Sequence, residues 1–275
     1  MSGESYRHPK FGLLTDPLNP VLPQIARFHR LGFDYVEIGI EEPAATPQVL
    51  LRQKDEILHT LSSHGMPTVG HTAYWVGFGS SHEKARRGWI SEAKEMIYVA
   101  SELKIKLLNF HFYPGHGRVG ASEKSKDTFL ENFINSMKEL SQHANELEVD
   151  LMLENVPPVK RNLLESIDCF SQVMNSVPAV RFHLDVAHAF IEGGMRGVKR
   201  YVYAFEDKLV NVHMHDNHGE LDEHLPLGRG TMNVRKVVKL LKAIGYDKTV
   251  TFEVFTSESD AVRSRKLFEK HWKKA

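Results

Sequence analysis

The sequence has few of the features that define several large protein classes. It contains one cysteine, Cys169, which excludes an intramolecular disulfide and a cysteine-rich zinc site. That usage is typical of a reducing compartment, so we expect a cytoplasmic protein. No apolar run approaches the roughly 18 residues that a membrane helix needs, and the N-terminus has no signal-like pattern. Lys+Arg and Asp+Glu both number 35, which argues against strong non-specific binding to nucleic acid or to membranes.

Short apolar runs alternate with longer helical patterns along the whole chain after a polar tail at residues 1–10. The composition, 41% hydrophobic and 25% charged, is ordinary for a globular protein. The predicted strands are Phe11–Leu14, Tyr35–Ile40, Pro67–Gly70, Ile105–Phe110, Val149–Leu153, Val180–Leu184, Leu209–Met214 and Thr249–Phe252. The predicted helices are Pro20–Leu31, Thr46–His64, His82–Leu103, Lys124–Leu147, Asn162–Asn175, Gly197–Phe205, Asn233–Ile244 and Glu258–Trp272.

Eight strand and helix pairs over 275 residues predict an α/β protein, a single (β/α)8 TIM barrel spanning residues 11–275. No linker-like segment divides the chain, so we assign one domain. The main alternative is a doubly wound open sheet. That fold usually carries a G-x-G-x-x-G turn after its first strand, and none is present here. In a barrel the active site lies at the C-terminal ends of the strands.

The segment from Leu209 to Gly230 is the densest in groups that bind cations. An alternating apolar strand is followed by a run of His, Asp and Glu and then by a Gly- and Pro-containing turn. The candidate ligands in it are His213, His215, Asp216, His218, Asp222, Glu223 and His224. Mixed imidazole and carboxylate donors suit zinc or manganese better than calcium or magnesium, which prefer oxygen ligands.

The same residue types recur at the ends of six consecutive predicted strands. These residues are His71, His111, Glu154, Asp185, His213 and Glu253, and three more follow just beyond strand ends: His188, Asp222 and His224. A single His at a strand end is usually a polar cap, and a lone Glu is usually an ion-pair partner. Six strands that each deliver a ligand to one barrel mouth instead predict a divalent metal centre with one to three ions.

Several motifs resemble those of the xylose-isomerase-like TIM-barrel superfamily, which includes endonuclease IV and many sugar or sugar-phosphate isomerases and epimerases. The resemblance runs from about Phe11 to the end of the chain. It rests on GHTAYW, NFHFYPGH, LENV, LDVAHAF, VHMHD, LDEHLPLGRG and FEVF. Similarity to endonuclease IV implies three zinc ions on nine side chains, matched here by His71, His111, Glu154, Asp185, His188, His213, Asp222, His224 and Glu253.

The isomerase and epimerase branch implies a smaller site within the same set. One divalent ion is expected on Glu154, Asp185, His213 and Glu253. In that chemistry the two glutamates are catalytic: one removes a proton next to a carbonyl and the other returns it, while the metal polarises the substrate oxygens. His188 is then expected to contact the substrate, a sugar or sugar phosphate.

The alternative is an endonuclease IV-like phosphodiesterase that cuts DNA at abasic sites. Tyr74 and Trp75 follow His71 at the spacing of the family's DNA-entering pair, and Trp75 could stack on a base or sugar or simply pack on the barrel rim. The loop after the second predicted strand argues against DNA binding, because it carries Glu41 and Glu42 where the phosphates of bound DNA would lie. The Ser-Lys that follows the Asn-Asp pair in endonuclease IV is also missing. The sequence therefore favours the isomerase or epimerase branch.

Three further features could contact a substrate or the metal. Arg229 in LGRG is a candidate for an anionic substrate group, because guanidinium binds phosphate or carboxylate through two hydrogen bonds. Gly115–Gly120, with His116 and Arg118, could hold a phosphate or be a flexible loop. Period-two alternation turns His213 and His215 to the same face, so His215 either supports the ligands or competes with His213. The oligomeric state, including a homo-oligomer, is open.

Overall fold

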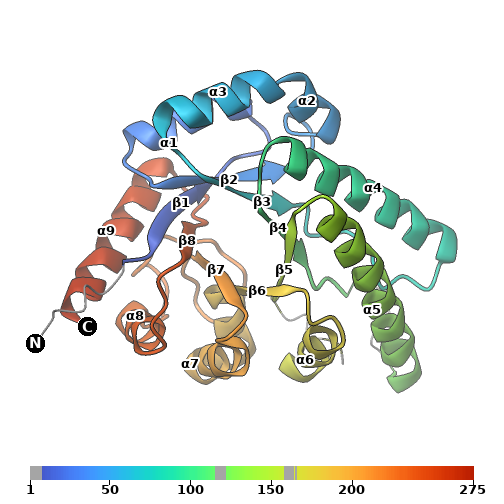
Figure 1. Cartoon of the computed structure of the whole chain (residues 1–275). Coiled ribbons are helices and arrows are strands. Elements are labelled where there is room, and N and C mark those ends of the chain that lie inside the picture. The colour runs from blue at the N-terminus through green and yellow to red at the C-terminus, as the bar shows by residue number, and fades with distance from the viewer. Residues whose placement is uncertain (1–7, 115–121, 158–163, 165) are drawn as a thin grey trace, which may run out of the picture.

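The chain folds into the predicted barrel. The computed structural model describes residues 8–114, 122–157, 164 and 166–275. Within them eight parallel strands close in chain order (Figure 1). The strands are β1 Lys10–Leu14, β2 Tyr35–Ile40, β3 Thr68–Thr72, β4 Leu107–His111, β5 Asp150–Glu154, β6 Arg181–Asp185, β7 Leu209–Met214 and β8 Thr249–Phe252.

Helices form a layer around the outside of the barrel (Figure 1). They are α1 Val21–Arg30, α2 Pro47–Arg52, α3 Lys54–His64, α4 Glu83–Glu102, α5 Glu123–Glu146, α6 Ile167–Ser176, α7 Val186–Phe205, α8 Val234–Ala243 and α9 Glu258–Lys274. Polar side chains start several of them: Ser122 makes a capping box with Ser125 on α5, and Asn233 accepts a hydrogen bond from the Lys236 amide on α8. None of the described helices combines the length and the apolar character that a membrane span requires.

Several element boundaries differ from the sequence prediction, most clearly at three helices. The helix expected at Thr46–His64 is two helices, because Gln53 adopts a non-helical ψ of 6° between α2 and α3. Helix α7 begins at Val186 rather than near Gly197, since the Asp185 carboxylate caps it directly; the kink at Gly193 and Gly194 had hidden this first half. The N-terminal part of the helix expected at Asn162–Asn175 lies outside the described residues, and α6 starts after Ser166.

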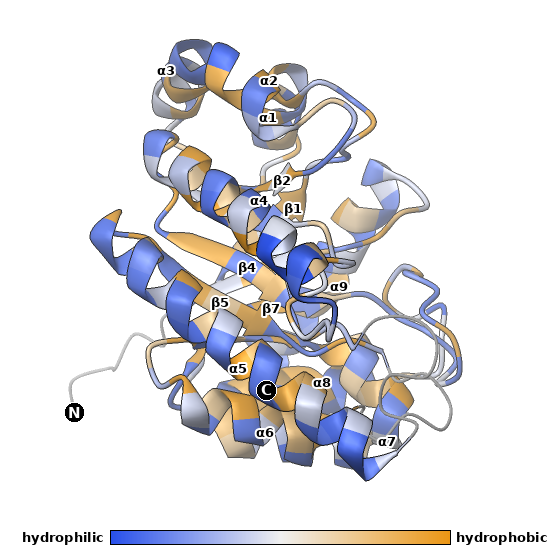
Figure 2. Ribbon diagram, turned by 90° about the vertical axis from the view of Figure 1, so that its right-hand side faces the viewer, coloured by the Kyte–Doolittle hydropathy of each residue, from blue (hydrophilic) through white to orange (hydrophobic). Residues whose placement is uncertain are grey.

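The two faces of the strands differ in chemistry. Side chains that point out toward the helices are apolar, as at Phe110, Phe182 and Phe252, which are fully buried. Figure 2 shows this hydrophobic layer along the strands and the inner sides of the helices. Inside the barrel, Tyr35, Val69 and Met152 form a small buried apolar layer, with Leu107 and Val210 packed against it. Above that layer the barrel interior is polar, and this polar column leads to the mouth where the predicted ligands lie.

Candidate metal centre

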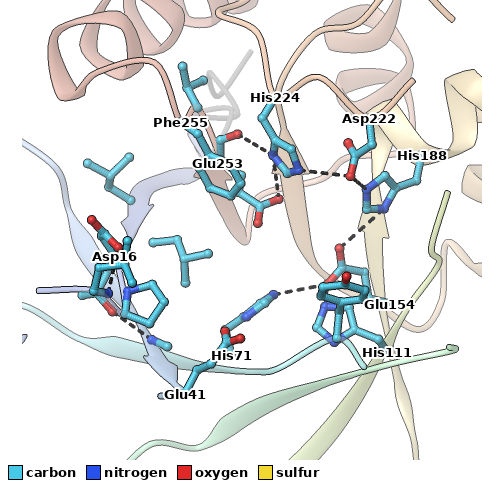
Figure 3. A pocket seen from close by; sticks show the side chains of 18 of the residues that line it. Asp16, Glu41, His71, His111, Glu154, His188, Asp222, His224, Glu253 and Phe255 are labelled. Carbon is cyan, nitrogen blue, oxygen red and sulfur yellow. Dashed lines mark hydrogen bonds and ion pairs between the residues drawn. The ribbon is translucent and has the colours of Figure 1, made fainter. Parts of the chain in front are cut away.

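A cleft of about 1000 Å³ opens at the C-terminal ends of the strands. Seven of the nine predicted ligands line it: His71, His111, Glu154, His188, Asp222, His224 and Glu253. In Figure 3, Glu154, His111, His188 and Asp222 lie on one side of the cleft, with Asp16 and Glu41 across from them. The other two, Asp185 and His213, are fully buried beneath its floor. The barrel therefore brings all nine predicted residues to one mouth.

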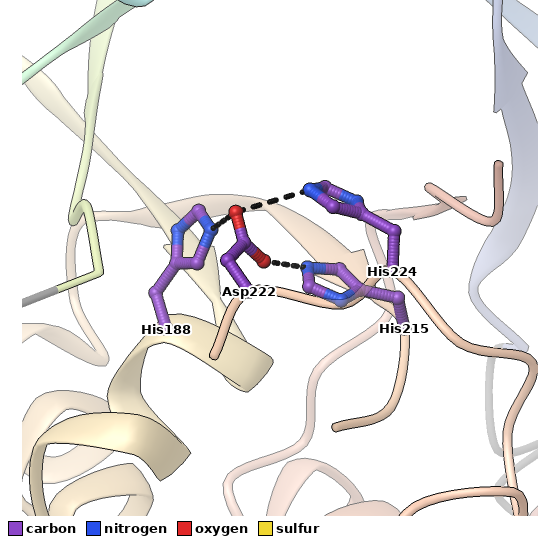
Figure 4. A group of neighbouring side chains, drawn as sticks. All are labelled: His188, His215, Asp222 and His224. Carbon is purple, nitrogen blue, oxygen red and sulfur yellow. Dashed lines mark hydrogen bonds and ion pairs between the residues drawn. The ribbon is translucent and has the colours of Figure 1, made fainter. Parts of the chain in front are cut away.

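The first group of donors is His188, His215, Asp222 and His224, whose ligand atoms lie within 4.8 Å of one another. Asp222 is its centre (Figure 4). Asp222 Oδ2 lies 3.2 Å from His188 Nε2 and 3.1 Å from His224 Nε2. Asp222 Oδ1 lies 3.8 Å from His215 Nε2. Three imidazoles thus converge on one carboxylate.

Backbone carbonyls hold two of these imidazoles from behind. His188 Nδ1 donates to the Asn155 carbonyl at 2.9 Å, and His224 Nδ1 donates to the Glu253 carbonyl at 3.0 Å. A carbonyl only accepts, so Nδ1 of each ring carries a proton and Nε2 is the nitrogen that faces the Asp222 carboxylate. That side of each ring needs a cation, either a second proton on Nε2 or a metal ion bound to its lone pair. Imidazoles oriented in this way by an outer hydrogen bond are typical of metal sites.

The second group, Asp185, His213 and Glu253, comes from the ends of β6, β7 and β8. His213 Nδ1 lies 3.1 Å from Glu253 Oε2 and 3.7 Å from Glu154 Oε1 at the end of β5. The Asp185 carboxylate accepts the His188 amide at 2.7 Å through Oδ1 and meets His215 Nε2 at 3.1 Å through Oδ2. These contacts join the second group to the first.

Glu154 links the second group to a third. Its Oε2 lies 3.1 Å from His111 Nε2 and 3.7 Å from His71 Nε2. The Asn109 amide also donates to the Glu154 carboxylate. His111 Nδ1 is buried and has no hydrogen-bond partner among the described residues. One carboxylate thus lies between two imidazoles on one side and His213 on the other.

Electrostatics indicate that this centre needs positive charge. Burial favours the neutral form of His188, but Asp185 and Asp222 outweigh it and raise its pKa to about 10. His224 behaves alike: Glu253 and Asp222 overcome burial and raise its pKa to about 9. Burial raises the pKa of Glu253, yet His213 and His224 hold it well below its usual value. The three groups contain only His, Asp and Glu, so this donor set fits a divalent ion of the zinc or manganese type.

Two buried residues beneath the centre were missed from the sequence. Glu37 on β2 and His183 on β6 form a further group with His213, with ligand atoms within 4.8 Å. Burial raises the pKa of Glu37, but the charge of His213 and its hydrogen bond lower it to about 2. Burial lowers the pKa of His183 to about 3, with His213 acting in the same direction. The sequence signal was an acid inside the apolar run YVEIGI and a His two residues before Asp185.

Residues 25–271 match the family model described as the xylose isomerase-like TIM barrel. The chain belongs to this family.

Relatives of the chain include proteins named as sugar epimerases. Fructoselysine 3-epimerase from Escherichia coli O157:H7 is 23% identical over 233 residues, which cover 82% of each chain. The uncharacterized protein MJ1614 of Methanocaldococcus jannaschii is 25% identical over 178 residues, and the match spans 65% of this chain and 66% of that protein. A solved structure of a D-tagatose 3-epimerase-like protein superimposes with a TM-score of 0.84, at 22% identity over 96% of this chain and 97% of that chain. That structural likeness establishes the shared fold.

Of the predicted substrate contacts, two line the cleft and two lie elsewhere. His188 and Tyr74 line the cleft, and Tyr74 is 54% exposed. Trp75 instead lines a neighbouring pocket of about 530 Å³ and packs edge-on against Trp89, with ring centroids 5.3 Å apart. Arg229 is exposed and is not among the cleft-lining residues. Trp75 and Arg229 lie in loops, so the alternation of side chains along a strand could not predict which way they point. The phosphate loop proposed at Gly115–Gly120 lies outside the described residues.

Proposed function

We propose that this protein is a divalent-metal-dependent isomerase or epimerase of a sugar or sugar phosphate. The observation that carries the proposal is the position of two carboxylates, Glu154 on β5 and Glu253 after β8. Both line the cleft, and both approach Nδ1 of His213. Two carboxylates beside one cation site are what proton transfer next to a carbonyl requires.

Each glutamate has a defined setting for this work. Glu154 is held by the Asn109 amide and faces the cleft beside His111. Glu253 contacts His213 and lies next to His224. One carboxylate removes the proton from the substrate carbon, and the other returns a proton to it. When bound, a divalent ion supplies Lewis-acid polarisation of the substrate oxygens.

The family relationship supports this assignment. Fructoselysine 3-epimerase, a relative that matches over 82% of each chain, is by its name a sugar epimerase. The metal-binding residues proposed here are His71, His111, Glu154, Asp185, His188, His213, Asp222, His224 and Glu253. They would hold one to three zinc or manganese ions.

The test is incubation of zinc- or manganese-loaded protein with a panel of ketoses and ketose phosphates in D2O. We expect deuterium to enter the substrate at the carbon next to the carbonyl, together with formation of the epimer or isomer. Glu154→Gln and Glu253→Gln should each abolish formation of the epimer or isomer, and the variant that lacks the proton-removing glutamate should lose deuterium exchange as well. Glu148→Gln, an exposed carboxylate just before the N-terminal end of β5, should change neither. Unchanged product formation by either active-site Gln variant would refute the two-glutamate assignment.

A second candidate is phosphodiester cleavage at abasic sites in DNA, favoured by the convergence of eight of the nine residues into linked groups, which His111 joins through Glu154. The position of Glu41, whose carboxylate lines the cleft, and that of Trp75 outside it both weigh against bound DNA. Nicking of a duplex with one abasic site by metal-loaded protein, lost in Glu154→Ala, would make this the function. If the DNA stays intact, sugar isomerisation or epimerisation remains the proposed function.

A further inference from the structure

Glu37 is a carboxylate that is fully buried inside the barrel, where water cannot solvate its charge. It lies on β2, fully buried, in the polar column below the cleft. A carboxylate that is removed from water is tolerated only when its oxygens are well bonded. Glu37 is not a cleft-lining residue, so it has no direct route to a substrate.

Both oxygens of Glu37 have partners. Oε1 lies 3.1 Å from His213 Nε2. Oε2 accepts from the Asn211 amide at 3.2 Å and from the Thr251 hydroxyl. Tyr35 in turn contacts Thr251 Oγ1 at 2.5 Å. These contacts come from β2, β7 and β8, so barrel closure itself holds the carboxylate against the ring of His213.

This contact fixes which nitrogen of His213 faces the cleft. Because Glu37 binds the Nε2 side of the ring, Nδ1 is the nitrogen left for the cleft side, and in the neutral ring with its proton on Nε2 it has the lone pair that a metal ion needs. Nδ1 lies 3.1 Å from Glu253 Oε2 and 3.7 Å from Glu154 Oε1. A carboxylate behind an imidazole also makes the opposite nitrogen a stronger donor.

The competing histidine has no such support. His215 Nε2 faces Asp185 Oδ2 at 3.1 Å. Its Nδ1 is buried without a hydrogen-bond partner among the described residues. The period-two pattern alone could not separate these two histidines, but their hydrogen bonds do.

We propose that Glu37 is a positioning residue that orients His213 with Nδ1 toward Glu154 and Glu253, so that His213 completes the four-residue metal site with Glu154, Asp185 and Glu253. The inference rests on the metal-dependent function proposed above. It adds a residue from β2, a strand that supplies none of the predicted ligands, to the machinery of the site.

The test compares Glu37→Gln with Tyr35→Phe. Gln keeps the size of the side chain but removes its charge, and Phe perturbs the same buried layer without touching His213. Manganese and zinc affinity are measured by competition with a chelator, without any substrate. We expect Glu37→Gln to weaken binding by about 10- to 100-fold and Tyr35→Phe to change it less than about threefold, with circular dichroism unchanged in both. Equal affinity of Glu37→Gln and the unmodified protein would overturn the proposal.

Nitrogen-15 NMR of the histidine rings provides a measurement that does not depend on the variant folding. In the metal-loaded, unmodified protein, His213 should carry its proton on Nε2 and show the metal shift on Nδ1. A proton on Nδ1 would overturn the proposal even if Glu37→Gln were insoluble. Neither measurement uses a sugar. A protein that binds metal as described but exchanges no substrate deuterium would therefore refute the proposed function and leave the role of Glu37 intact.

Discussion

The imidazole of His224 stacks on that of His215, with ring centroids 4.0 Å apart and planes 16° from parallel. The stack holds both rings beside Asp222, although the two residues lie on different parts of the β7 loop. His215 was the ambiguous histidine of the sequence, and the structure makes it a member of a four-residue group rather than an outlying residue.

His215→Ala should therefore weaken metal binding by removing a ring that contacts Asp185 and Asp222 and that stacks on His224. We expect a loss of about tenfold or more in affinity, the scale on which disturbing the surroundings of a metal site acts. The matched control is His218→Ala in the same loop, where the side chain is 55% exposed and pairs only with Glu223. Titration of both variants with zinc or manganese separates them. If the two variants bind the metal equally well, His215 does not belong to the metal centre.

Asp222→Asn should lower the number of bound ions without emptying the centre. Asp222 is the carboxylate shared by His188 and His224, whereas Glu154, Asp185, His213 and Glu253 do not depend on it. The metal-to-protein ratio, measured by elemental analysis, should fall in this variant and stay constant in Glu223→Gln, its neighbour in sequence. An unchanged ratio in Asp222→Asn would confine metal binding to the four-residue site.

Metal binding should strengthen as the pH rises from neutral toward about 9. In the metal-free protein the raised pKa values of His188, about 10, and His224, about 9, stabilise the fold. That stabilisation is complete below the unfolded value of about 6.5 and is lost as pH rises through 9 to 10. A metal ion must displace the protons of His188 and His224, so its affinity increases as the pH approaches the pKa values of these two residues. The metal-induced rise in Tm should grow over this interval, and a constant rise would contradict the assignment.

Gly230→Ala should loosen the loop that carries Asp222 and His224. An added Cβ would lie 2.2 Å from the Asn217 carbonyl and 2.5 Å from Asp216 Oδ1. Overpacking of this kind costs typically about 1–3 kcal/mol, and here it also shifts two proposed ligands. The control is Gly88→Ala on α4, where nothing lies within 4 Å of the new atom and about 0.5–1 kcal/mol of stabilisation is expected. Urea unfolding and metal affinity measure both effects. Normal values for Gly230→Ala would exclude this close approach.

The barrel and the direction of its mouth could be predicted because both follow from local patterns. Eight apolar runs alternate with helical periods, and parallel strands all place their last residues at the same end. The predicted strand ends at Gly70 and Phe110 were two residues and one residue early, since β3 continues through His71 to Thr72 and β4 ends at His111. These small shifts do not move a residue to the other end of the barrel, so the candidate ligands still lie at the predicted mouth.

Glu37, Trp75 and Arg229 show what local patterns could not supply. Glu37 meets His213, 176 residues away, only because the barrel closes. No spacing rule predicts that contact. Trp75 and Arg229 lie in loops, where no period fixes the direction of a side chain, and they turn to a neighbouring pocket and to solvent. Asp222 and His224 also lie in a loop, yet they reach the cleft, so position in the chain alone did not separate the loop residues that line it from those that do not.

Asp185 has two functions that no single substitution can separate. Its Oδ1 caps α7 through the His188 amide, and its Oδ2 faces His215. Loss of the carboxylate would fray the first turn of the helix that carries His188, so a variant would lose a ligand, a helix start and the placement of a second ligand together. The start of α7 and the proposed metal site thus share one carboxylate, and a bound ion should protect the amides of this first turn from hydrogen exchange more than those of any other described helix start.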